Sequence, residues 1–222
     1  ARIIKRNYPH FSIRASAFAM VASADKARQW EDLGVDTICV SAIACNRNPT
    51  RLRQLREAVR CELQLIANAS CLLDCAYEPT HMNLLTQSSR RADPTHGFCL
   101  DYCVLHCSRR RLHDPTNYVR ACWIRPEDLH LYEELGYDYF KILERSCPAD
   151  LLIKRVRAYA RRQFDGNLYE LVGPVATVTR ELKATPFQRA RLLWSMLRPH
   201  KVKVSSLLEV QRYIKEVIPH RY

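Results

Sequence analysis

Residues 35–67, VDTICVSAIACNRNPTRLRQLREAVRCELQLIA, contain the pattern that decides the fold. The opening run, VDTICVS, is short and apolar and predicts a buried strand. The sequence NPT at residues 48–50 then opens a predicted helix, in which Leu52 and Leu55 share one face. CELQLIA at residues 61–67 predicts the next strand. A strand, a helix and a second strand joined by short connections are typical of a parallel α/β sheet.

Similar elements follow one another on both sides of this stretch. Upstream, residues 11–21 alternate apolar with small or polar residues and predict a strand. Ser23 then caps a predicted helix that runs to about Leu33 and ends at Gly34. Downstream, the regular pattern resumes at residues 123–125. The elements predicted after that point are a helix opened by residues 126–128, a strand at 137–143, a basic helix at 148–163, and helical stretches near 186–197 and 205–217.

These elements place the chain in the α/β fold class. About five strands are predicted, which is too few to close an eight-stranded barrel, so either a smaller open sheet or part of a barrel is expected. The chain starts at Ala1, with no initiator methionine and no signal-peptide segment, which favours part of a barrel. We therefore expect a partial α/β barrel domain over residues 1–172 and a C-terminal helical extension over residues 173–222.

The regular pattern is interrupted by an insertion at about residues 68–120. This insertion is far longer than an ordinary connection between elements. In α/β folds, and in barrels especially, long segments after a strand end are where functional sites are built. A functional site is therefore predicted in the insertion.

Two pairs of cysteines lie in the insertion: Cys71 with Cys75, and Cys103 with Cys107. Three residues separate the members of each pair, and on a helix this spacing would place both thiols on one face. Four thiols form a ligand set for a soft metal or an iron–sulfur cluster. Zinc sites usually have a tighter spacing, whereas a cluster can be held by varied spacings.

Other residues of this kind have more than one interpretation. Cys99 lies one turn before Cys103 and is a fifth candidate for four positions. His81 is a candidate metal ligand, proton shuttle or loop-ordering group. The remaining cysteines are interpreted as small buried hydrophobic residues: Cys39, Cys45, Cys61, Cys122 and Cys147.

The composition is that of a globular protein with a basic surface. The 222 residues suffice for one sizeable core, and the formal net charge of +12 favours RNA or anionic small molecules as partners, unless it is only a solvated surface. The 10 cysteines without a secretory signal argue against a disulfide framework and favour the cytoplasm. No apolar run reaches about 18 residues, so we expect no membrane span.

Several runs of the chain resemble the collagenase-like, unassigned-type peptidase family 32. They cover roughly residues 1–172 in a consistent order, and the most specific is ACWIRPEDLHLYEELGYDYFKILER. Residues 71–77, CLLDCAY, are similar to the family element C-L-x-x-C-P-[YF], with Ala76 where proline is usual. The other matching runs are IIKRNYPH, SADKARQWEDLGVDTICVS, CELQLIANASCLLDCAYEPTHMN, DYCVLHCSRRRLHDPTNYVR and RRQFDGNLYEL.

The resemblance implies a TIM-type barrel that carries a [4Fe–4S] cluster, with this chain truncated at both ends. It implies that Cys71, Cys75, Cys103 and Cys107 hold the cluster and that Cys99 does not. It also implies oxygen-independent hydroxylation of a quinone precursor, an RNA base or another small molecule. A prephenate-like anionic oxygen donor and a partner protein of the same family are the partners expected on this basis.

Polar residues near strand ends are the candidates for a substrate pocket under this hypothesis. Arginine and lysine would bind a carboxylated donor, and Glu144 or His81 would move protons. The substrate-binding candidates are Asn68, Arg125, Lys141 and Arg145. Each of these residues has an alternative role in a structural ion pair.

Two alternatives belong to other functional classes. The first is a basic RNA-binding protein with a structural metal, in which Arg109–Arg111 and Arg161–Arg162 neutralise phosphates. The second is a peptidase, as the family label suggests, although the sequence shows no pair of nucleophile and base.

Overall fold

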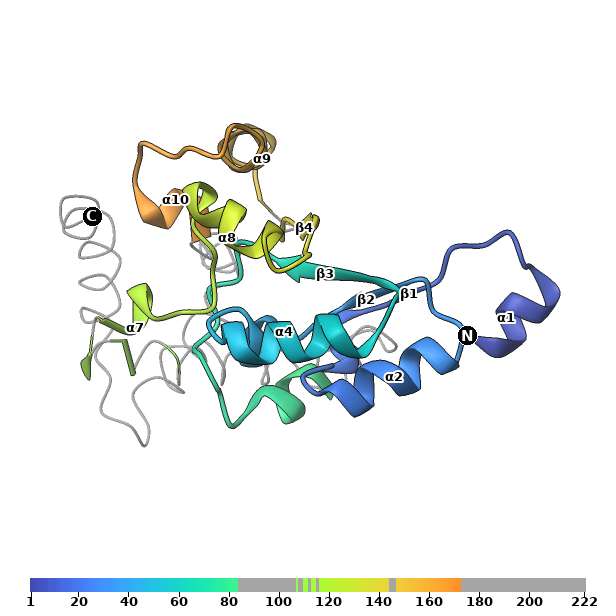
Figure 1. Ribbon diagram of the computed structural model, residues 1–222. Helices are drawn as coiled ribbons and strands as arrows, with labels where there is room; N and C mark the ends of the chain where they lie inside the picture. Colours follow the sequence, from blue (N-terminus) through green and yellow to red (C-terminus); the bar gives the residue numbers. More distant parts are fainter. Residues whose placement is uncertain (84–106, 108–109, 112, 115, 144–146, 173–222) are drawn as a thin grey trace, which may run out of the picture. The chain divides into compact units, whose positions relative to one another are not determined.

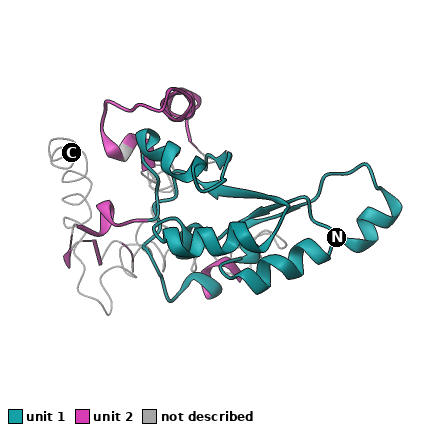
Figure 2. Cartoon of the chain, in the orientation of Figure 1, with its two compact units in different colours: residues 1–79, 122–143 teal, residues 80–121, 144–222 magenta. Residues whose placement is uncertain are grey.

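The computed structural model describes residues 1–83, 107, 110–111, 113–114, 116–143 and 147–172. The chain divides into two compact units, each described here by itself (Figure 2). Unit 1 comprises residues 1–79 and 122–143, and unit 2 comprises residues 80–121 and 144–222. The predicted helical extension over residues 173–222 lies outside the described residues.

Unit 1 is built on a parallel sheet with the strand order β1-β2-β3-β4 (Figure 1). The predicted α/β class with a parallel sheet is therefore confirmed. The strands are β1 (Arg14–Ala15), β2 (Thr37–Cys39), β3 (Glu62–Ile66) and β4 (Tyr139–Lys141). Four described strands do not make a closed barrel, so the predicted TIM-type barrel is not established.

Three of the predicted strands are present in shortened form, and the strand predicted at residues 11–21 needs correction. The strand predicted at residues 11–21 is reduced to β1 and an isolated bridge between Val21 and Val40. Residues 123–125 are not a strand, although the Ile124 N–H donates to the carbonyl of Ala67 at 2.7 Å. This contact lies one residue beyond the end of β3.

The helices of unit 1 begin where the caps predict. Ser23 accepts a hydrogen bond from the Lys26 N–H and starts α2, and Asn48 accepts one from the Arg51 N–H and starts α4. In Figure 1, α2 and α4 run along the sheet. The helices and 3-10 turns of this unit are α1 (Arg2–Asn7), η1 (Ala17–Ala19), α2 (Ala24–Asp32), α3 (Ala42–Cys45), α4 (Pro49–Ala58), η2 (Pro126–Asp128) and α8 (Leu129–Glu133).

The described part of unit 2 is helical. It contains α7 (Thr116–Val119), α9 (Ala149–Arg161) and α10 (Leu168–Val172). The buried Arg155 of α9 donates from Nε to the carbonyl of Glu170 at 2.7 Å, and Lys154 pairs with the Glu170 carboxylate at 2.6 Å. These contacts join α9 to α10. In neither unit does a described helix have the length and apolar character that crossing a membrane requires.

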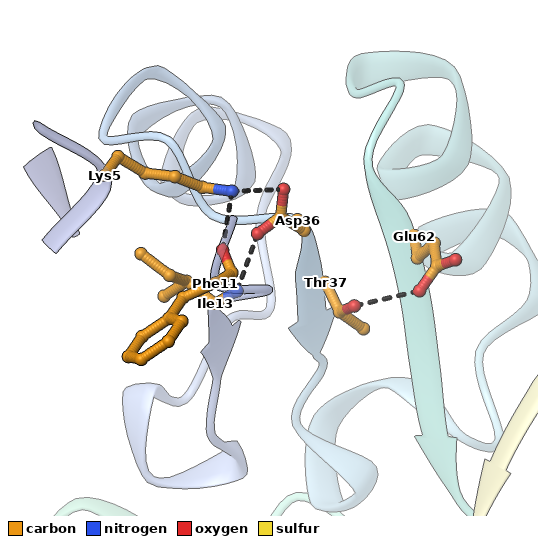
Figure 3. Close-up of polar contacts among 6 residues, drawn as sticks. All are labelled: Lys5, Phe11, Ile13, Asp36, Thr37 and Glu62. Atoms are coloured by element: carbon orange, nitrogen blue, oxygen red, sulfur yellow. Dashed lines mark hydrogen bonds and ion pairs between the residues drawn. The ribbon is translucent and has the colours of Figure 1, made fainter. Parts of the chain in front are cut away.

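The two faces of the sheet differ because side chains alternate along each strand. Ile38, Leu63 and Leu65 point to one face and are at most 1% exposed, as are Leu52 and Leu55 of α4. This face and the helices form the apolar core. Thr37 and Glu62 lie on the opposite face, where the Thr37 hydroxyl donates to the Glu62 carboxylate at 2.9 Å (Figure 3).

A carboxylate ties the N-terminal segment to the start of β2. Asp36 accepts a hydrogen bond from the Ile13 N–H at 2.6 Å and pairs with Lys5 at 2.8 Å (Figure 3). Lys5 also donates to the carbonyl of Phe11 at 2.9 Å. The Ile13 N–H and the Lys5 ammonium hold the pKa of Asp36 below its usual value.

Truncation of Leu65 tests the core. We expect Leu65→Ala to lower the free energy of unfolding by about 2–5 kcal/mol, because it removes a side chain that is wholly buried and leaves a cavity. Leu131→Ala is the control, since Leu131 is 49% exposed on α8. Urea denaturation measures both variants, and equal losses would contradict this description of the core.

The Asp36 contact predicts a pH dependence with a defined sign. A carboxyl group with a lowered pKa contributes stability above its unfolded pKa near 4, and this contribution disappears as the pH falls through the folded pKa. Asp36→Asn should therefore be less stable than the parent at pH 7, and the difference should shrink as the pH falls through the lowered folded pKa of Asp36.

Thermal unfolding from pH 7 to pH 2.5 measures this difference. The control is Asp25→Asn, because Asp25 is exposed and pairs only with Arg28 one turn away. A gap between Asp36→Asn and the parent that stayed constant over the whole range would argue against the ionic contact.

Candidate metal centre

The first cysteine pair lies in the loop that follows β3. Leu72, only 4% exposed, anchors this loop in the core, and the Asp74 N–H donates to the carbonyl of Ile43 at 3.1 Å. Asp74 has a φ of 47°, which is incompatible with a right-handed helix. Cys71 and Cys75 are therefore separated by a turn, and the helical segment starts later, at residue 78. Helical spacing does not position these two thiols.

A buried thiol, that of Cys122, lies against Cys71. The Cys122 N–H donates to the carbonyl of Cys71 at 3.1 Å, and its Sγ lies 3.3 Å from the carbonyl oxygen of Ala69. Hydrogen bonding to the Cys71 thiol, together with burial, raises the pKa of the Cys122 thiol. Two thiols from distant parts of the chain thus meet at the loop after β3.

Sequence analysis missed the position of Cys122. Its interpretation as a buried residue agrees with its exposure of 0%, but its contact with Cys71 was not predicted. No sequence signal indicates this contact, which arises because Cys122 directly precedes the segment whose Ile124 N–H donates to the carbonyl of Ala67, just after β3. That return to the sheet brings Cys122 to Cys71.

The other predicted ligands are less completely placed. Cys75 and Cys107 are half-buried in units 1 and 2 respectively, and Cys103 and Cys99 lie outside the described residues. Across the described ranges, no three histidine, cysteine, aspartate or glutamate side chains gather as a metal ion would require. The set of four thiols predicted from the sequence therefore stays a prediction.

The other cysteines have the surroundings of structural residues. Cys39 and Cys45 are at most 1% exposed, and burial raises the pKa of the Cys45 thiol to about 12. Cys61 and Cys147 are half-buried, and burial together with the Glu31 carboxylate raises the pKa of the Cys61 thiol to about 11. Because their pKa values are raised, the thiols of Cys39, Cys45 and Cys61 stay protonated at neutral pH and are poor nucleophiles.

His81 lies in unit 2, in the helical segment at residues 78–83. Burial lowers the pKa of its imidazole below the usual value. The ring is therefore neutral at pH 7, and a neutral imidazole can accept a proton or bind a metal.

The side chain of Asn68 is engaged by the backbone. Its amide nitrogen donates to the carbonyl of Leu143 at 3.2 Å, and its amide oxygen accepts from the Leu143 N–H at 2.6 Å. This pair of bonds joins the chain after β3 to the chain after β4. Both groups that would recognise a substrate are thus committed to the scaffold.

The other predicted substrate residues differ in their surroundings. Arg125 donates from Nε to the Glu127 carboxylate at 2.7 Å, which is a structural ion pair at the start of η2. Lys141 is exposed at the end of β4. Glu144 and Arg145 lie outside the described residues.

Comparison with known proteins identifies similar sequences and structures. The chain is 32% identical over 160 residues to the uncharacterized protease MJ1657 of Methanocaldococcus jannaschii. It is also similar to the solved structure of the U32 peptidase Mk0906, with 23% sequence identity and a TM-score of 0.41, over 65% of this chain and 51% of that chain.

The match covers only part of each protein. The aligned part is 72% of this chain and 47% of MJ1657, so the chain spans about half the length of this curated relative. No family model matches the sequence. The name of MJ1657 refers to a protease and that of Mk0906 to a U32 peptidase, and neither name refers to a cluster or to hydroxylation.

The role of Asn68 can be tested by truncation. Asn68→Ala should lower the free energy of unfolding by about 1–3 kcal/mol, because it leaves the N–H and C=O of Leu143 without their partners. Asn7→Ala, at an exposed position at the end of α1, is the control. Urea denaturation measures both, and an unchanged midpoint for Asn68→Ala would exclude the structural role.

Proposed function

We propose that this chain binds an iron–sulfur cluster through a centre built on Cys71, and that it acts as an oxygen-independent hydroxylase-type oxidoreductase or as a component of one. The observation that carries the proposal is the placement of Cys122 against Cys71 of the loop after β3, where the Cys122 N–H donates to the carbonyl of Cys71 at 3.1 Å. Loops at the carboxyl ends of parallel strands are where α/β folds build their sites.

The chemistry of the donors suits a soft metal. Thiolates are the ligands that iron–sulfur clusters and other soft metals prefer. A thiol as deeply buried as that of Cys122 resists ionisation, and a bound metal supplies the positive charge that allows deprotonation. Cys75 lies in the same loop, and Cys103 and Cys107 are the further ligands that the sequence predicts. A bound cluster supplies electron transfer at this place.

Residues of each unit have suitable secondary roles. In unit 1, Lys141 presents an exposed ammonium at a strand end, where it can bind a carboxylate. In unit 2, the neutral imidazole of His81 can accept a proton at pH 7. We propose that Lys141 binds a carboxylated oxygen donor and that His81 transfers a proton.

Anaerobic purification tests the proposal directly. We expect a brown protein with broad absorption near 400 nm and with both iron and acid-labile sulfide, on the order of four of each per chain. Cys71→Ala, Cys103→Ala and Cys122→Ala should lose iron, sulfide and colour together. A colourless preparation that contains zinc or no metal would contradict the proposal.

Matched cysteine variants separate ligation from folding. Cys39→Ala and Cys45→Ala also remove fully buried thiols of unit 1, but they should retain the cluster. Circular dichroism before metal analysis shows which variants fold. If Cys45→Ala lost the cluster and Cys122→Ala kept it, the assignment of Cys122 would be wrong.

The peptidase alternative is supported by the names of the similar proteins. It predicts hydrolysis of gelatin that persists in Cys71→Ala, because peptide cleavage would not need the thiol centre. The same preparations used for metal analysis serve this assay, and cluster-independent cleavage would favour the peptidase.

A further inference from the structure

The polar face of the sheet in unit 1 has a buried floor and an exposed rim. Thr37 and Cys39 of β2 pair in register with Glu62 and Gln64 of β3, and Gln64 also pairs with Tyr139 of β4. Of these side chains, Thr37, Cys39 and Gln64 are buried, whereas Glu62 and Tyr139 are exposed. The floor is thus formed by Thr37, Cys39 and Gln64, and the rim by Glu62 and Tyr139.

Gln64 is the unusual residue of the floor. It is only 7% exposed, and its amide oxygen is shielded from water with no hydrogen-bond partner among the described residues. Leaving a buried carbonyl oxygen unsatisfied costs roughly 1–3 kcal/mol. A ligand with an N–H or O–H group would satisfy this acceptor.

Two cations belong to the same face of the sheet, because Arg14 pairs in register with Thr37 and Lys141 lies two residues after Tyr139 on β4. Burial raises the pKa of the Cys39 thiol, and the charges of Lys141 and Arg14 act in the opposite direction. Cys39 pairs in register with Gln64, so the two charges that act on the Cys39 thiol also lie near the unsatisfied amide oxygen of Gln64. Neither the Arg14 guanidinium nor the Lys141 ammonium has a hydrogen bond or ion pair within the part of the chain that the structure describes.

The carboxylate on this face is already engaged. Glu62 accepts a hydrogen bond from the Thr37 hydroxyl at 2.9 Å (Figure 3), and hydrogen bonding to Glu62 raises the pKa of Tyr139. Glu62 therefore has two hydroxyl groups as hydrogen-bond partners, whereas the side chains of Arg14 and Lys141 have no hydrogen bond among the described residues. The face carries an excess of positive charge that an anion would balance.

We propose that this face binds a small carboxylate that also carries an O–H or N–H donor, as hydroxy acids and amino acids do. Arg14 and Lys141 bind the carboxylate, and the Gln64 amide oxygen accepts a hydrogen bond from the donor. Arginine and lysine suit this role because their hydrogen bonds to carboxylates are charge-assisted. This inference rests on the carboxylate-binding role proposed above for Lys141, and the site does not include the cysteine thiols.

Three four-carbon dicarboxylates that differ in one substituent provide the probes. Succinate has no donor at its second carbon, L-malate has a hydroxyl there, and L-aspartate has an ammonium. Isothermal titration calorimetry on the full chain should show malate and aspartate binding about tenfold more tightly than succinate, since one hydrogen bond to a buried acceptor is worth roughly that much.

Substitutions test separately the hydrogen bond to Gln64 and the binding of the carboxylate by Lys141 and Arg14. Gln64→Leu should bind all three probes with equal affinity, because the acceptor is gone. Lys141→Gln and Arg14→Gln should each weaken all three by about tenfold or more while the preference for malate over succinate remains. Lys141 and Arg14 are exposed, so these two variants test the site even if Gln64→Leu fails to fold. Arg28→Gln, an exposed residue of α2, is the control and should bind like the parent.

Each outcome decides the proposal. Absence of binding by all three probes, equal affinity for succinate and malate in the parent, or full binding by both Lys141→Gln and Arg14→Gln would overturn it. Cys71→Ala should bind malate normally even when it has lost its metal. A failure of the cluster proposal is therefore distinguishable from a failure of this one.

Discussion

The structure of unit 1 depends on the parallel pairing of β3 with a strand on each side. The register aligns Leu63 with Ile38 and Leu65 with Phe140, which brings the apolar side chains of neighbouring strands to one face. A shift by one residue would move every side chain of β3 to the other face. It would bury Glu62 against α4 and expose the leucines, so the hydrophobic core and the polar face are determined together.

The sequence predicted the parts of this arrangement that depend on local signals. Ser23 and Asn48 located the starts of α2 and α4, because a capping side chain bonds to the backbone within three residues. The apolar runs located β2, β3 and β4 but made them too long, since burial extends past the last ladder hydrogen bond. The regular pattern was predicted to resume at residues 123–125, where Trp123 and Ile124 are buried but form no strand.

These local signals could not predict contacts between residues that lie far apart in the sequence. The sequence pointed to the loop after β3 as a functional region, but it grouped cysteines by their spacing along the chain. The structure joins Cys71 to Cys122 instead, through the segment that returns to β3. Similarly, an alternating pattern places Gln64 on the polar face, but only the structure shows that its amide oxygen lacks a partner among the described residues. The placement of Cys103 still rests on sequence alone.

The two hydrogen bonds between Asn68 and Leu143 have an evolutionary consequence. They fix the points at which the chain leaves β3 and β4, so the segments that begin there start from anchored ends. Loop closure becomes only slightly less favourable as a loop lengthens. Insertions or deletions beyond these two points would therefore leave the sheet register unchanged. Such a clamp allows the segments after both strands to diverge in length and content while the scaffold stays constant.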